Sequence, residues 1–400
     1  MRVALPFSFL CFLSLRCTAA YWVRLGTLLT AATTSSVRRA MHEPVSPTSL
    51  DIVVKSLQNV AMNSSHVAWG DLDLFVREKR PLDYKKSWAD TSAWAEELKA
   101  ILGGPGNNDF DSMFERVLRD GNWYGAVEHK LLAGASVGSD QRPWVVLVTG
   151  LNGIRKTTSL YQPWFRDVLK EALGEAFPAD PSLLPVGANS FFRQLDYMIA
   201  TLASDEFRDL YSQAAAGLPT SAYSALKDGI FKRHRTIAEI LGVLLLRCAQ
   251  DRGLNALVES SGRDIASFDY IESIFVPRPE YRKLVLRFTI DDIGHAERSV
   301  DARMADEMRA GGALATARTD NARAVVAVNA GGPYGSEVLK SVQADGDKVW
   351  ASVLEDREGR RGDWLMASIQ ISGSTDPAGW TARAILPDGQ PSARSYPFQR

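Results

Sequence analysis

The segment VVLVTGLNGIRKTTSLYQ, residues 145–162, constrains the fold of this 400-residue chain more than any other. Its first residues are apolar or β-branched, which predicts a buried strand over residues 145–149. The glycines at Gly150 and Gly153 predict a tight turn, and the residues from Lys156 onward predict a helix. A buried strand that leads through a glycine-rich turn directly into a helix indicates an α/β protein.

Later parts of the chain repeat this alternation. The apolar runs NALVESS, KLVLRFTI and AVVAVNAGG are separated by long helical stretches such as residues 227–253. We therefore expect an α/β fold with a mostly parallel sheet and helices on both faces. Near the C-terminus, KVWASVL, DWLMASIQI and WTARAIL predict short strands, and the final RSYPFQR predicts a disordered end.

The leader has two parts. An apolar run at residues 3–15 follows Arg2, and small residues come next, as in a secretory signal peptide. Residues 21–45 are rich in Ser, Thr and Arg and contain one acid, which is typical of a transit peptide. This order resembles the leaders of algae with secondary plastids and predicts a plastid protein; the alternatives are a secreted or a mitochondrial protein.

We expect five segments along the chain. They are a signal peptide at 1–20, a transit peptide or linker at 21–45, a helical extension at 46–142, a nucleotide-binding domain at 143–340, and a β-rich C-terminal segment and tail at 341–400.

The composition limits the partners that we expect. The formal net charge of −1 shows no basic excess for nucleic acid. Outside the leader Cys248 is the only cysteine, so the mature chain has neither an internal disulfide nor a cysteine metal cluster. The apolar run of the leader is too short to span a bilayer, and we expect no integral membrane segment in the mature chain.

The opening segment has the layout of a phosphate-binding loop, also called a P-loop or Walker A motif. In such a loop, glycines let backbone N–H groups close around phosphates, a lysine reaches the outer phosphates, and the next hydroxyl binds Mg²⁺. We therefore expect a site for a nucleotide and Mg²⁺. Its predicted nucleotide-binding residues in this segment are Gly150, Asn152, Gly153, Arg155, Lys156, Thr157 and Thr158.

Arg155 departs from that layout, because it stands where a second defining glycine belongs. Its side chain either extends outward or adds a cation over the phosphates. The alternative is a loop that keeps the fold but no longer binds nucleotide.

Two further segments carry candidate acids. Glu259 ends the apolar run of residues 253–259, where an acid orients the Mg²⁺ shell or a catalytic water; the alternative is a helix cap or an ion pair. Arg263 binds phosphate or pairs with Asp264. In residues 185–211 the expected strand end holds Asn189, which cannot act as a base, so Asp196 is the nearest candidate general base.

Residues 289–312 form a helical segment with three arginines. Arginines of a closing helix neutralise charge on a transferring phosphoryl group. The candidates are Arg298, Arg303 and Arg309, of which we prefer Arg303; the alternative is a solvated helix face. The following residues 324–339 predict a strand and a second glycine-rich loop, where Asn329 packs on the nucleotide base or stands in a tight turn.

Taken together, residues 144–339 resemble the zeta-toxin-like branch of the P-loop kinases, which have a three-layer α/β fold. The resemblance implies transfer of the terminal phosphate of ATP to a small hydroxyl-bearing acceptor. It implies phosphate binding by Gly150, Gly153, Lys156 and Thr157, and charge neutralisation by Arg303. The predicted metal ligands are Thr157 and Glu259.

A second resemblance is to the signal-recognition-particle-type GTPases, through GLNGIRKTT, NSFFR and ESSGR. In that family aspartates begin the second and third motifs, whereas Asn189 and Glu259 stand here. The chain also lacks a TKxD-type guanine-selecting motif. A third interpretation is a nucleotide-binding scaffold without catalysis.

Overall fold

The structure is a computed structural model, and residues 44–400 form one compact unit in it. The leader segments and most of the predicted helical extension lie outside the described residues. The described ranges are 69–79, 84–101, 142–179, 184, 190–193, 195–251, 255–275, 281–317, 322–329, 331–356, 361–376 and 379–399.

A seven-stranded mixed sheet organises this unit, with the strand order β2-β3-β1-β4-β5-β6-β7. The first five strands in this order are parallel, and β6 and β7 are antiparallel additions at one edge. The strands are β1 Trp144–Thr149, β2 Ser190–Arg193, β3 Asn255–Glu259, β4 Arg282–Ile290, β5 Trp364–Ser372, β6 Thr381–Ile385 and β7 Tyr396–Pro397. The predicted α/β class with a mostly parallel sheet is confirmed.

Helices cover both faces of the sheet. The described helices are α3 Trp69–Glu78, α4 Tyr84–Ile101, α7 Lys156–Leu160, α8 Phe165–Leu173, α9 Leu195–Leu202, α10 Ser204–Ala215, α11 Thr220–Asp251, α12 Ala266–Phe275, α13 Ile293–Thr316, α14 Ala322–Val328 and α15 Leu339–Glu355, with the short 3₁₀ turns η1 Gly174–Ala176 and η4 Ser336–Val338.

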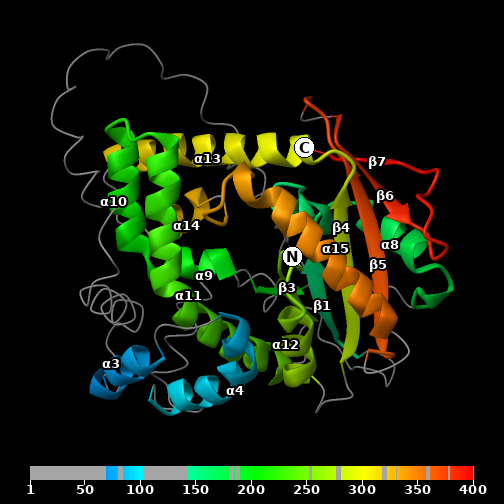
Figure 1. Ribbon diagram of the computed structural model, residues 1–400, viewed down its shortest axis with the longest axis horizontal. Helices are drawn as coiled ribbons and strands as arrows, with labels where there is room; N and C mark the ends of the chain where they lie inside the picture. Colours follow the sequence, from blue (N-terminus) through cyan, green and yellow to red (C-terminus); the bar gives the residue numbers. More distant parts are fainter. Residues whose placement is uncertain are drawn as a thin grey trace, which may run out of the picture. The chain divides into compact units, whose positions relative to one another are not determined.

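Alternate residues of β4 show how the two faces are covered. Leu284 belongs to the buried cluster that includes Val168 of α8. The preceding Lys283 points to the other face, where its ammonium lies 3.2 Å from the carboxylate of Glu272 in α12. This alternation is the two-residue period of a strand. The helix α15 runs across the α12 face, and α10, α11 and α13 pack together beside the sheet (Figure 1).

Three of our predictions for the C-terminal half are wrong. The run AVVAV lies in α14, and KVWASVL lies in α15, where Trp350 and Val353 are buried three residues apart, as a helix requires. Short apolar runs fit a strand and a buried helix equally well. The expected disordered end contains β7, and Tyr396 and Phe398 are 3% and 6% exposed. The strands β5 and β6 match DWLMASIQI and WTARAIL and extend the main sheet.

Within the predicted N-terminal extension, the described residues are helical, as α3 and α4. The helix α4 packs on α11 and α12, and Glu96 forms an ion pair with Arg247 of α11. Across the described residues, no helix combines the length and the apolar character needed to cross a membrane.

Candidate functional site

The carboxyl ends of the parallel strands meet at one edge, as ligand sites in such sheets require. Val148 near the end of β1 pairs with Glu259, the last residue of β3. The chain beyond β3 stays against β1, because Ser260 N donates to Val148 O at 2.9 Å and Gly150 N donates to Ser261 O at 3.3 Å. The loop of residues 150–155 therefore starts beside the acid that ends β3.

Glycine is required at two positions of this loop. Gly150 has φ +134°, and a β-carbon there would lie 2.4 Å from Phe288 O. Gly153 has φ +83°, and a β-carbon there would lie 2.7 Å from Val300 Cγ2 and 2.9 Å from Ala296 O. Val300 and Ala296 belong to α13, so the loop packs directly on this helix. The two glycines thus allow both the positive φ of the loop and its close approach to β4 and α13.

Replacing Gly153 with alanine is expected to lower the free energy of unfolding by about 2–4 kcal/mol, because overpacking adds to the conformational cost at positive φ. The matched control is Gly217→Ala, since Gly217 has φ +91° but a β-carbon there would meet nothing within 4 Å. Chemical denaturation measures both variants. Equal losses in the two would mean that the contact with α13 does not constrain the loop.

Lys156 begins α7 with its side chain buried in the loop. Its Nζ donates to Gly150 O at 2.8 Å and to Leu151 O at 2.7 Å, and it lies 3.5 Å from a carboxylate oxygen of Glu259. Burial lowers the pKa of the Lys156 ammonium, while Glu259 opposes that shift. The lysine is thus a desolvated cation held over its own loop.

Thr157 and Glu259 bring two oxygen-bearing side chains together. The Thr157 hydroxyl donates to Glu259 Oε2 at 2.7 Å. Among the described residues there is no group of three or more His, Cys, Asp or Glu side chains arranged for a metal. Mg²⁺ is usually bound through one or two carboxylates plus the phosphates of the substrate, so this pair fits it without a full protein cage.

A cavity of about 450 Å³ opens at this edge. Its volume lies within the range of small-molecule sites. Within the described residues, the amide N–H groups of Gly153, Lys156 and Thr157, which line it, have no hydrogen-bond acceptor. The predicted site residues in its wall are Asn152, Gly153, Arg155, Lys156, Thr157, Thr158, Asp196, Glu259, Arg263 and Arg303.

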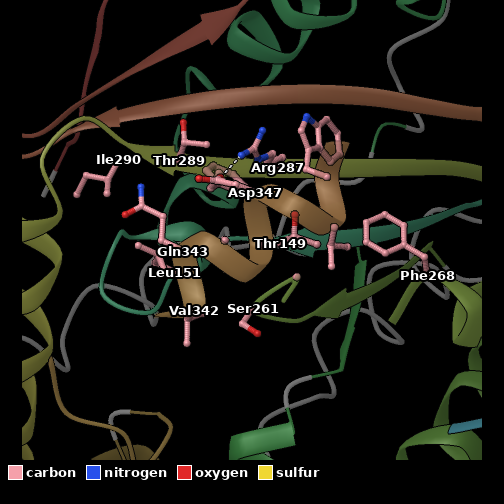
Figure 2. Close-up of a pocket in the computed structure, with 16 residues that line it drawn as sticks. Thr149, Leu151, Ser261, Phe268, Arg287, Thr289, Ile290, Val342, Gln343 and Asp347 are labelled. Atoms are coloured by element: carbon pink, nitrogen blue, oxygen red, sulfur yellow. Dashed lines mark hydrogen bonds and ion pairs between the residues drawn. The ribbon is translucent and has the colours of Figure 1, made fainter. Parts of the chain in front are cut away.

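A second, much smaller cavity lies beneath the loop, between α15 and strands β1 and β4 (Figure 2). Its volume of about 40 Å³ has room for a water molecule and excludes a nucleotide. Gly150 lines this cavity and not the larger one. Figure 2 shows Arg287 of β4 paired with Asp347 of α15 at its rim.

Asp196 occupies the position that we assigned to Asn189. The strand β2 begins at Ser190, so Asn189 precedes it and is not at its carboxyl end; Asn189 itself lies outside the described residues. Asp196 lies in the first turn of α9, directly after β2, and lines the cavity. Burial raises the pKa of its carboxyl group, and the nearby cations Lys227 and Arg303 oppose the shift.

Lys227 is part of a buried network behind Asp196. Its Nζ lies 2.7 Å from Glu307, which also accepts a 2.7 Å hydrogen bond from the Tyr223 hydroxyl. Burial lowers the pKa of Lys227. Removing one member of such a pair leaves a buried charge, so the network holds α11 and α13 together around Asp196.

The structure separates the three candidate arginines of α13. Arg303 lines the cavity and packs against Gly331. Arg309 is largely exposed and pairs with Asp306, whereas Arg298 contacts the His295 ring at 3.0 Å. Arg298 and Arg309 therefore lie outside the cavity wall, because a helix presents residues five or six apart on different faces.

The second glycine-rich loop, residues 331–335, closes over the cavity. The ring of Tyr334 lies 5.8 Å from the Arg263 guanidinium, and Gly332 approaches Asp196 and Asn152. Of the two alternatives for Asn329, the turn is observed: the residue is 2% exposed, lies outside the cavity wall and accepts a hydrogen bond from Gly331 N at 3.1 Å. It forms the turn that ends α14.

Arg155 turns towards the C-terminal segment. Its φ of 62° is left-handed, a conformation that disfavours a residue with a β-carbon by roughly 1–2 kcal/mol. Its guanidinium lies 4.6 Å from the centroid of the Trp380 ring and 5.3 Å from that of Phe398. The outward alternative is the observed one.

Sequence reasoning missed several residues of the cavity wall, including Phe231, Arg235, Tyr270 and Tyr334. Phe231 and Arg235 lie four residues apart on α11, a spacing that brings them to one face. No motif marks Phe231, Arg235 or Tyr270, whereas Tyr334 lies in the second glycine-rich loop that the sequence indicated. No protein-family model matches the chain, and neither the curated proteins nor the solved structures contain a match to it.

Proposed function

We propose that this protein is an ATP-dependent phosphotransferase, similar to the zeta-toxin-like P-loop kinases, that acts on a small hydroxyl-bearing acceptor. One observation carries the proposal. The ammonium of Lys156, the hydroxyl of Thr157 and the carboxylate of Glu259 converge on a cavity of about 450 Å³ that Asp196 and Arg303 also line.

In this proposal the loop binds the phosphates of ATP. The amides of Gly153, Lys156 and Thr157, which have no acceptor among the described residues, donate to phosphate oxygens, and Lys156 exchanges its carbonyl partners for the outer phosphates. Thr157 and Glu259 would hold Mg²⁺, which would supply positive charge to offset the negative charge of the phosphates. The positioning of charged groups accounts for most of the catalysis in phosphoryl transfer.

Asp196 takes the acceptor's proton. As the acceptor oxygen bonds to the terminal phosphorus, the bond from that phosphorus to the bridging oxygen breaks, ADP leaves, and the hydroxyl proton passes to the Asp196 carboxylate. The raised pKa of Asp196 makes its ionised form a stronger base than an ordinary aspartate. Arg303 offsets charge on the transferring group.

The test is a titration of the purified protein with Mg-ATP and with Mg-GTP, followed by a search for phosphorylated hydroxyl compounds. We expect ATP to bind more tightly and its terminal phosphate to be transferred. Tighter binding of GTP, with hydrolysis but no transfer to an acceptor, would favour the signal-recognition-particle-type GTPase over the kinase. ATP binding without turnover on any acceptor would favour a nucleotide-binding scaffold without catalysis. Binding of neither nucleotide would contradict the proposed nucleotide site.

Replacing Glu259 with glutamine is expected to lower turnover, or the affinity for Mg²⁺, by about 10- to 100-fold. The amide keeps the shape of the side chain but removes the negative charge that pairs with Thr157 and the metal. Turnover against Mg²⁺ concentration measures the effect, and Glu355→Gln, on the exposed face of α15, is the control. An unchanged dependence of turnover on Mg²⁺ concentration would contradict a role of Glu259 in binding the metal.

Plastid targeting remains a prediction, with secretion and mitochondrial import as its alternatives. The leader on which it depends lies outside the described residues. Fusion of residues 1–45 to a fluorescent protein in an alga with a secondary plastid tests it directly.

A further inference from the structure

The C-terminal segment, residues 379–399, contacts the loop of residues 150–155 at Arg155. Arg155 is the only non-glycine residue with positive φ in the described part of the chain, and it directly precedes Lys156. Its guanidinium lies against the rings of Trp380 and Phe398. Both rings are more than nine-tenths buried. The loop thus meets a preformed aromatic surface at the position where a glycine is expected.

This aromatic surface is anchored independently of Arg155. Phe398 N donates to Trp380 O at 3.0 Å, which keeps the two rings on adjacent backbones. The Phe398 ring packs edge-on against Trp164 at 5.2 Å, and Trp164 Nε1 donates to Pro397 O at 2.8 Å. The Tyr396 hydroxyl donates to Glu171 of α8 at 2.6 Å. The rings therefore keep their place relative to α8 without the arginine.

A left-handed backbone is unfavourable for arginine, and the stack on two rings offsets that cost. The conformation at Arg155 sets the direction in which the chain enters α7, and hence the starting point of the Lys156 side chain. We infer that Trp380 and Phe398 are positioning residues of the nucleotide site: they hold Arg155, and through it the backbone that presents Lys156. The inference rests on the proposed function only for the identity of the ligand.

A double-mutant cycle tests this role in the full chain. The variants are Trp380→Leu, Arg155→Gly and the two combined. Glycine adopts positive φ without strain, so it needs no stack to hold the loop. Trp144→Leu is the matched control, because Trp144 is a buried tryptophan stacked on Arg282, 4.2 Å away, at the opposite end of β1. Phe398→Leu is a second, milder probe in case Trp380→Leu does not fold.

Two measurements separate the inference from the proposed function. The first is hydrogen exchange of the amides at residues 151–157 without nucleotide, and the second is the dissociation constant for Mg-ATP. In the protein that keeps Arg155, we expect Trp380→Leu to raise the exchange rate of the loop amides and the dissociation constant for Mg-ATP about fivefold each. In the Arg155→Gly protein, Trp380→Leu should leave both quantities nearly unchanged. The control should leave loop exchange as in the wild type.

Equal effects of Trp380→Leu in both backgrounds would overturn the inference, because the tryptophan would then act without Arg155. No effect on exchange in either background would also overturn it. A wild-type protein that binds no ATP would count against the proposed function instead, and the exchange data would still decide whether the aromatic pair positions the loop.

Discussion

Replacing Lys156 with methionine is expected to abolish detectable Mg-ATP binding and to lower any phosphotransfer by about 10²–10³-fold. Lys156 is 4% exposed, and its ammonium lies 3.5 Å from the Glu259 carboxylate that bonds to Thr157. Methionine keeps most of the side-chain volume but removes the charge and the donors to Gly150 O and Leu151 O. The expected loss of binding and turnover therefore reports the charge and hydrogen bonds of the lysine and not its volume.

Calorimetric titration with Mg-ATP and a turnover assay measure this effect, and thermal unfolding checks that the variant remains folded. Lys340→Ala is the control, because Lys340 is 76% exposed and its ammonium lies 3.8 Å from Glu297. Full ATP affinity in a folded Lys156→Met protein would contradict a phosphate-binding role for the loop.

Replacing Asp196 with asparagine is expected to lower kcat by about 10²–10⁴-fold while Mg-ATP still binds, because the amide cannot accept the acceptor's proton. Asparagine has nearly the same size and still reaches Gly332 and the cavity. A kinase that loses only its general base keeps its nucleotide site. Turnover and calorimetry on the same sample separate the two quantities.

The pH dependence gives this prediction a second readout. Burial raises the pKa of Asp196, so its carboxyl group loses its proton at a higher pH than an ordinary aspartate. Activity should therefore rise with pH through that raised pKa, and the rise should be absent in the residual activity of Asp196→Asn. The control is Asp345→Asn, an exposed carboxylate on α15. If activity rises with pH over the same range in the wild type and in Asp196→Asn, another group is responsible for the rise.

Long periodic segments and the glycine-rich motif were predictable from the sequence. The strands β1, β3 and β4 and the helices α11 and α13 lie where the pattern of apolar residues placed them. The helices depend on local periodicity, which tertiary contacts rarely reverse in long segments, whereas the strands were recognised as apolar runs bounded by turn residues. The loop was predictable for a similar reason, since Gly150 and Gly153 have the positive φ that such a turn requires.

Short apolar runs were not predictable in the same way. Val325 and Val326 in α14 are both fully or nearly fully buried, so neither a two-residue nor a 3.6-residue period marks them. The assignment of Asn189 to a strand end failed because element boundaries shift by a few residues when only propensity is used. The candidate base Asp196, predicted as a substitute for Asn189, lies just beyond the carboxyl end of β2.

The sequence by itself determined the local chemistry of this protein: a buried strand, a turn that only glycine permits, and a lysine and threonine after it. Only the tertiary structure decided which distant groups meet them. Arg155 lies against the rings of Trp380 and Phe398, a contact that no position in the sequence indicated, whereas Glu259 was already expected beside Thr157, to which it is hydrogen-bonded. Local periodicity is set by neighbours in the chain, whereas such contacts depend on which strands and helices pack together, and no local pattern encodes that choice.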